Sequence, residues 1–111
     1  MDNLLVKAAL YEDDLEEKIN FMATELQVDH VLQKPSNLYS YGERQRIAII
    51  RALIQPFDWL LLDEPFSHLD QANARRAATL ISQEVSARNA GMIVTSLGRD
   101  EYFEYDEILR L

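Results

Sequence analysis

The first third of the chain carries apolar residues at steps of three and four, the spacing of an amphipathic helix. Between residues 3 and 33 the apolar positions at this spacing are Leu4, Leu5, Ala8, Ala9, Leu15, Ile19, Met22 and Leu26. The pattern predicts two structural helices. The second should begin at Asp13-Asp14, where acids would lie at the positive end of the helix dipole. Pro35-Ser36-Asn37 then ends the helical pattern.

The next pattern is a helix followed by a strand. A helix is predicted from Glu43 to Gln55, with Pro56 just beyond it. Its apolar face comprises Ile47, Ile50, Leu53 and Ile54. The run from Phe57 to Leu62 is short, apolar and closed by acids, which predicts a strand buried on both faces.

Helical and strand patterns continue to alternate after residue 70. Residues 71–88 are expected to form a helix, and Met92–Thr95 a second buried strand. The residues of this helix that are expected to point inward are Ala72, Ala77, Leu80, Ile81 and Val85. A short helix or turn from Asp100 to Tyr105 would lead to a third strand at Ile108–Leu111. This alternation predicts an α/β fold with parallel strands.

Composition narrows the class of protein. An apolar share of 48% favours a folded chain, and a net charge of −8 argues against nucleic-acid or anionic-lipid binding through bulk charge. The absence of cysteine excludes disulfides and thiolate metal sites, and fits a cytosolic setting. No apolar run approaches the roughly 18 residues that span a bilayer.

Two places in the sequence carry candidate chemistry. Asp63 and Glu64 follow an apolar run, so both should emerge at the C-terminal end of a strand, where ligands bind in open α/β sheets. A solvated acidic turn before Pro65 explains the pair as well. Ser40 offers a hydroxyl at a helix start and Gly42 permits close backbone approach, which suits a phosphate. Ser40 could equally be only a helix cap.

Taken in order and spacing, these motifs resemble the second half of an ABC-type ATPase domain. Tyr39–Glu43 matches the family's signature loop, usually Leu-Ser-Gly-Gly-Gln, and Gln45-Arg46 matches the Gln-Arg that follows it. Trp59–Glu64 matches the Walker B strand and Ser67–Asp70 the D-loop. A Gly-x-x-x-x-Gly-Lys-Ser/Thr phosphate loop does not occur in the sequence, and only 39 residues precede Ser40. The chain therefore resembles a C-terminal part of such a domain.

The resemblance implies an architecture for each part of the chain. Residues 1–55 would be a portion of the helical subdomain, with the signature loop and the helix after it. Residues 56–111 would be the C-terminal half of the P-loop NTPase core, with Walker B, the D-loop and a degenerate H-loop.

The resemblance also implies roles for individual residues. Asp63 would hold Mg²⁺ through water, and Glu64 would polarise the water that attacks ATP. Asp70 would lie in the D-loop between two such domains, although capping the following helix is its competing role. The residues expected to contact ATP in trans, across a dimer interface, are Tyr39, Ser40, Gly42 and Glu43.

Three positions depart from the family pattern. Tyr41 stands where a glycine is usual, and Glu43 adds a negative charge in place of glutamine, so contact with phosphates in trans should be weaker or slower to form. Ser96, 32 residues after Glu64, stands where a histidine normally bridges the γ-phosphate and the attacking water. Because a hydroxyl is shorter than imidazole and carries no positive charge, either hydrolysis is slow or another group takes over the role of the histidine.

The leading hypothesis is an ATP-binding subunit that hydrolyses Mg-ATP to drive a transmembrane permease from the cytosolic face. It would pair with a second ATP-binding domain, with residues 1–34 near the permease. The fragment alone should be inactive because it lacks the phosphate loop. One alternative is a degenerate, non-hydrolytic domain that donates its signature loop. Another is an inactive piece that self-associates or swaps through exposed strand edges.

Overall fold

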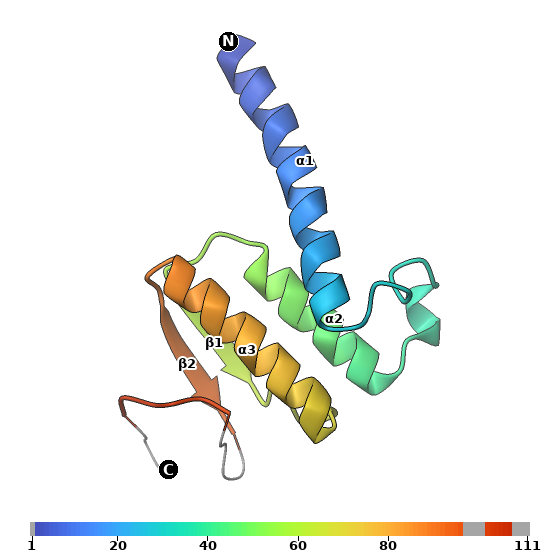
Figure 1. The fold of residues 1–111 in the computed structure, drawn as a ribbon, viewed down its shortest axis with the longest axis vertical. Coiled ribbons are helices and arrows are strands. Elements are labelled where there is room, and N and C mark those ends of the chain that lie inside the picture. The colour runs from blue at the N-terminus through green and yellow to red at the C-terminus, as the bar shows by residue number, and fades with distance from the viewer. Residues whose placement is uncertain (1, 97–101, 108–111) are drawn as a thin grey trace. The chain divides into compact units, whose positions relative to one another are not determined.

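The computed structural model describes residues 2–96 and 102–107 of the chain. Its elements are α1 (Asp2–Glu25), η1 (Ser36–Leu38), α2 (Tyr41–Leu53), β1 (Trp59–Asp63), α3 (Gln71–Ala87) and β2 (Gly91–Thr95) (Figure 1). They fall into two compact units, Met1–Pro56 and Phe57–Leu111. The parallel strands β1 and β2, joined through α3, confirm the predicted α/β fold. Among the described helices, none has the length and apolar character needed to cross a membrane.

The first unit begins with one helix where two were predicted. α1 runs without a break through Asp13-Asp14, so the prediction of a second helix starting there is wrong. No glycine or proline occurs between residues 2 and 25, and aspartate in a helix interior costs far less than either of these residues. Nothing in this segment therefore interrupts the helix.

The end of α1 is set by a local turn. Gln27 adopts a left-handed conformation with φ of 58°. Its N–H donates to the carbonyl of Thr24 at 3.1 Å, and the N–H of Val28 donates to the carbonyl of Ala23 at 2.8 Å. These two bonds form a Schellman motif, which satisfies carbonyls that a helix end leaves unpaired. Gln27 occupies the position that glycine usually takes, which hid the turn from the sequence pattern.

The core of the first unit lies between the end of α1 and α2. Its buried side chains are Met22, Ala23, Leu26, Val28, Val31, Ile47, Ile49, Ile50 and Leu53. Three of the four residues predicted for the apolar face of α2 are among them, and Ile54 is half-buried. α2 begins at Tyr41, two residues before the predicted start, because Ser40 caps it.

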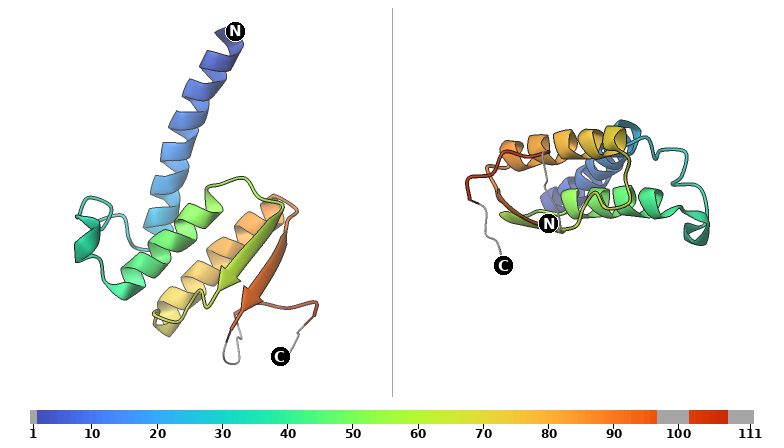
Figure 2. Two further views of the ribbon diagram at one scale, coloured as in Figure 1. Left: turned by 180° about the vertical axis from the view of Figure 1, so that it is seen from behind. Right: turned by 90° about the horizontal axis from the view of Figure 1, so that it is seen from below.

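The second unit contains the parallel strand pair with α3 alongside it (Figure 2). Cα partners run from Trp59 opposite Gly91 to Asp63 opposite Thr95. Buried positions alternate along β1 and form a stripe along α3: Leu60, Leu62, Ala74, Ala77, Ala78, Leu80 and Ile81. Ala72 is exposed, so its predicted inward position is wrong, whereas Val85 is half-buried. α3 ends in a second Schellman motif, with Asn89 at φ of 51°.

One face of this sheet remains open among the described residues. Trp59, Leu61 and Ile93 are 64%, 69% and 52% exposed. β1 alternates between exposed and buried positions, so the prediction that both of its faces are buried is wrong for this structure. Gly91 lies under the ring of Trp59, where a Cβ atom would approach the ring to 2.4 Å. A larger residue at position 91 would therefore require the Trp59 ring to move.

The segment after β2 is described only in part. Residues 102–107 form bends rather than a helix, and the third strand predicted at 108–111 lies outside the described residues. Phe66 contacts the rings of Tyr102 and Phe103, with centroids 5.2 and 5.6 Å apart. Aromatic packing of this kind ties residues 102–103 to the loop that follows β1.

Candidate functional site

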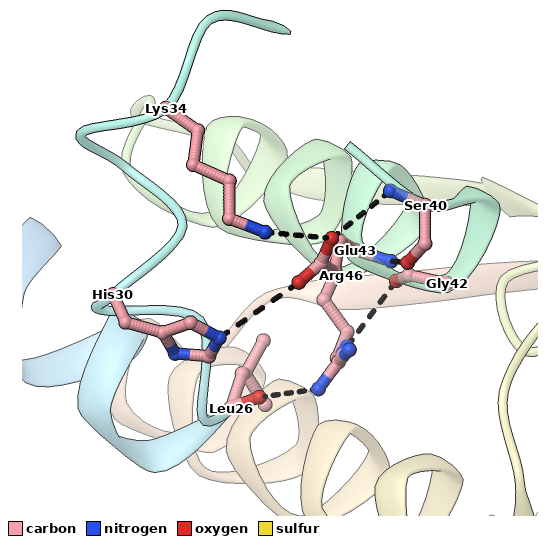
Figure 3. Close-up of polar contacts among 7 residues, drawn as sticks. All are labelled: Leu26, His30, Lys34, Ser40, Gly42, Glu43 and Arg46. Atoms are coloured by element: carbon pink, nitrogen blue, oxygen red, sulfur yellow. Dashed lines mark hydrogen bonds and ion pairs between the residues drawn. The ribbon is translucent and has the colours of Figure 1, made fainter. Parts of the chain in front are cut away.

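The candidate residues of the first unit lie at the start of α2. Ser40 is the N-cap, and its Oγ accepts a hydrogen bond from the N–H of Glu43 at 3.1 Å. The N–H of Ser40 donates in return to Oε1 of Glu43 at 2.9 Å (Figure 3). This reciprocal pair is a capping box, so the structural role considered for Ser40 is confirmed. Contact of Ser40 with a phosphate stays a prediction.

Glu43 is surrounded by groups that favour its negative charge. The hydrogen bond from the backbone N–H of Ser40 is the main cause that lowers the pKa of Glu43. Lys34 Nζ lies 3.8 Å from Oε1 and His30 Nε2 lies 3.8 Å from Oε2, and both contribute to the lowering, while partial burial opposes it (Figure 3). The negative charge expected at the signature loop is present, but a lysine beside it offsets its field.

Arg46 connects the start of α2 to the end of α1. Its Nε donates to the carbonyl of Gly42 at 3.2 Å, and its Nη1 donates to the carbonyl of Leu26 at 3.0 Å (Figure 3). Leu26 follows α1 directly, where helix carbonyls lack intrahelical donors. Arg46 therefore anchors the first turn of α2, and with it Gly42, to the preceding helix.

Tyr39 and Tyr41 flank Ser40 in different surroundings. Tyr39 is half-buried and lines an open depression of about 450 Å³. The other residues that line it are Ser36, Asn37, Arg44, Ile47 and Arg51. Tyr41 is 74% exposed. Its bulk therefore projects from the helix start at the position where the family usually has glycine.

The acid pair of the second unit lies at the C-terminal end of β1. Asp63 is the exposed last residue of the strand, and Glu64 follows it half-buried. Thr95, at the same level of β2, donates from Oγ1 to Oδ1 of Asp63 at 2.5 Å. Its carbonyl accepts the N–H of Glu64 at 2.9 Å. Glu64 itself is left-handed, with φ of 45°.

Ser96 lies at the same sheet edge as the acid pair. It follows Thr95 at the end of β2, just as Glu64 follows Asp63 at the end of β1, and its side chain is exposed. Ser96 therefore follows the last residue of β2 that pairs with β1. What Ser96 does there remains a prediction.

The end of β1 offers oxygen donors, the kind of ligand that Mg²⁺ prefers. In the described ranges 2–96 and 102–107, no cluster of three or more His, Cys, Asp or Glu side chains could hold a metal. Magnesium is commonly held by one or two carboxylates together with water and substrate phosphates. Asp63 and Glu64 fit such a partial donor set, because oxygen donors at an exposed strand end leave room for the remaining ligands.

Asp70 caps α3. Its Oδ1 accepts a hydrogen bond from the N–H of Asn73 at 2.8 Å. The capping role that competed with an interface role is therefore present in the structure. A place for Asp70 between two domains stays a prediction.

Three residues that contact the candidate site residues lie outside the sequence motifs. Lys34 and His30 face Glu43 from the loop after α1, and Thr95 contacts both acids. Thr95 could have been found by aligning the two predicted strands as a parallel pair. No comparable signal marks Lys34 or His30, because their approach depends on the turn after α1.

Acids at the end of a parallel strand and a capped, glycine-containing helix start are both features of α/β proteins that bind phosphate-containing ligands. The profile of a family described as ABC transporter matches residues 2–67, more than half of the chain. The chain belongs to this family, and it corresponds to part of an ATP-binding domain.

Relatives of known function carry related names. The chain is 33% identical over 81 residues to the "Thiamine import ATP-binding protein ThiQ" of Shigella flexneri serotype 5b, an alignment that covers 73% of this chain and 35% of that protein. It is 36% identical over 84 residues to the "Glucose import ATP-binding protein GlcV" of Saccharolobus solfataricus, covering 76% of this chain and 24% of that protein. The chain thus spans about a third or less of the length of these relatives.

Proposed function

We propose that the chain is part of an ATP-binding subunit of an import transporter. The observation that carries the proposal is the acid pair Asp63-Glu64 at the end of β1, supported on β2 by Thr95. Related proteins are named for ATP binding in import systems. Since those names give two different solutes, thiamine and glucose, the proposal stops at import and does not extend to a solute.

The proposed reaction is cleavage of the terminal phosphoanhydride bond of ATP by water. Glu64 polarises the attacking water, and Asp63 holds Mg²⁺ through water. When bound, Mg²⁺ supplies positive charge that offsets the charge of the phosphates. The positive end of α2 faces ATP bound in a second domain. The residues that contact this ATP are Tyr39, Ser40, Gly42 and Glu43.

The proposed assembly follows from these roles. Residues 1–55 act as a portion of the helical subdomain, and residues 56–111 as the C-terminal half of the α/β core. Asp70 lies in the D-loop, close to the second ATP-binding domain. The subunit works on the cytosolic side of a membrane through a permease, with residues 1–34 nearest to it. The phosphate loop is supplied by a segment outside these 111 residues, since the sequence contains none.

Calorimetry with Mg-ATP tests the proposal. It should be run on this chain and on a version extended upstream by a phosphate-loop segment, with Asp63→Asn in the extended version as the matched control. We expect binding by the extended version only, weakened by Asp63→Asn. Binding by the 111 residues alone would refute the proposed dependence on an external phosphate loop. Failure of both versions to bind would overturn the nucleotide function.

Ser96 favours a second candidate, a non-hydrolytic domain that donates its signature loop to a competent partner. Serine stands at the position where the family's histidine acts, and the strand register places it at the edge that carries the acids. ATP turnover by the complete protein separates the candidates, because only a hydrolytic domain shows it. Ser96→His should raise a slow turnover, and an unchanged rate would refute the role given to this position.

The open sheet face favours self-association of the 111-residue chain. Trp59, Leu61 and Ile93 expose large apolar surface on one side of the strand pair, and such surface favours association. Light scattering should show a dimer that Leu61→Lys converts to a monomer. A monomer at every concentration tested would refute self-association.

A further inference from the structure

Thr95 lies where the parallel register brings β2 level with the acid pair. Its Cα pairs with that of Asp63, although the two residues are 32 positions apart in the sequence. Two of its groups face β1. The side-chain hydroxyl donates to Oδ1 of Asp63 at 2.5 Å, and the main-chain carbonyl accepts the N–H of Glu64 at 2.9 Å. One residue thus contacts both members of the pair.

The contact with Asp63 has the geometry of a charge-assisted hydrogen bond. Separations of about 2.5–2.7 Å are typical when a hydroxyl donates to a carboxylate. In the described part of the chain, Oδ2 of Asp63 accepts no hydrogen bond. The hydroxyl therefore occupies one carboxylate oxygen and leaves the other available to a ligand.

The contact with Glu64 stabilises an uncommon backbone conformation. A φ of 45° lies in the left-handed region, which residues other than glycine seldom adopt. Such a conformation persists when surrounding contacts enforce it. The hydrogen bond from the N–H of Glu64 to the carbonyl of Thr95 is such a contact.

We propose that Thr95 is a positioning residue for the acid pair: its hydroxyl fixes the rotamer of Asp63, and its carbonyl fixes the turn at Glu64. The proposal rests on the proposed function only for its consequence, which is tighter binding of a divalent cation by Asp63. The orientation of Asp63 itself is a property of the 111-residue chain. The hydroxyl contact is the part that a side-chain substitution removes.

The first experiment needs no metal. Three-bond couplings from the Asp63 Cγ to its backbone N and C′ report its χ1 rotamer in solution by NMR. In the wild-type chain and in Thr95→Ser, which keeps the hydroxyl, we expect one rotamer. In Thr95→Val, which keeps the shape and suits a strand, we expect averaged couplings. Thr79→Val is the matched control, since the Thr79 hydroxyl donates to the Arg75 carbonyl within α3.

A second experiment measures the consequence for the cation. Binding of Mn²⁺ with ATP is followed by electron paramagnetic resonance in the version extended by a phosphate loop. Loss of a group that orients a metal ligand typically costs about 10–100-fold in metal affinity. We expect Thr95→Val to weaken Mn²⁺ binding at least tenfold and Thr95→Ser to restore it to within about threefold, since Ser keeps the orienting hydroxyl.

The outcomes separate this proposal from the proposed function. A single Asp63 rotamer in Thr95→Val refutes the positioning role, whatever the metal data show. Averaged couplings in Thr95→Val support the positioning role. If the wild-type extended version then fails to bind Mn²⁺ with ATP, the nucleotide function is refuted while the positioning role stands. Equal loss in Thr95→Val and Thr95→Ser refutes the hydroxyl as the cause.

Discussion

The packing of Trp59 on Gly91 gives a prediction whose sign depends on a second residue. Replacing Gly91 by alanine would place Cβ 2.4 Å from two carbon atoms of the indole ring, so the ring must move. Overpacking of this kind costs about 1–3 kcal/mol. Gly91 does not have a positive φ, so alanine fits its backbone and contributes about 0.4–1 kcal/mol through the unfolded state. The expected net destabilisation by Gly91→Ala is about 0–2.6 kcal/mol.

Removing the ring should reverse the effect. In a Trp59→Ala background no ring opposes the new methyl group, so Gly91→Ala should stabilise the chain by about 0.4–1 kcal/mol. The four variants of this double-mutant cycle are unfolded in urea and followed by far-UV circular dichroism, because Trp59 is the chain's sole tryptophan and its fluorescence is lost. If Gly91→Ala changes the free energy of unfolding by the same amount and with the same sign in both backgrounds, the steric explanation is refuted.

Three further predictions concern the helix starts and are checked by urea unfolding. Ser40→Ala removes the cap of α2 and should cost about 0.5–2 kcal/mol, whereas Ser36→Ala, at an exposed residue outside the cap, should be near neutral. Asp70→Ala should destabilise α3 by a similar amount, and Asp70→Asn, which can still accept from the Asn73 N–H, should not; equal losses would contradict the cap. The pKa of Glu43 is lowered from 4.5, so its ionised form stabilises the fold above that pH and the contribution is lost as the pH falls through the lowered pKa. The stability difference between wild type and Glu43→Gln should therefore shrink as the pH falls below 4.5, and a constant difference would refute this.

Local patterns in the sequence predicted much of the structure. The α/β alternation, the strand at β1, the apolar face of α2 and the caps at Ser40 and Asp70 all depend on residues within a few positions of each other. A capping side chain bonds an amide three residues away, so the sequence contains both participants. The motifs that place the chain in its family are equally local.

Two errors came from features whose local signal is ambiguous. Acids at residues 13–14 are compatible with a helix start and with a helix interior, and α1 passes through them. The apolar run of β1 is compatible with burial on one face or both, and Trp59 and Leu61 are exposed. In each case the deciding factor is what packs against the segment, which the segment itself does not encode.

The sequence by itself determined which groups the candidate site contains: the acids Asp63 and Glu64, Ser96, and the capped helix start at Ser40. Tertiary structure decided how two of them are oriented. Thr95 reaches Asp63 and Glu64 only because β1 and β2 pair in a parallel register, and Lys34 reaches Glu43 only because the chain turns back after α1. Such contacts depend on pairing between segments distant in the chain, and the free energy of that pairing comes from the shared core rather than from either segment alone.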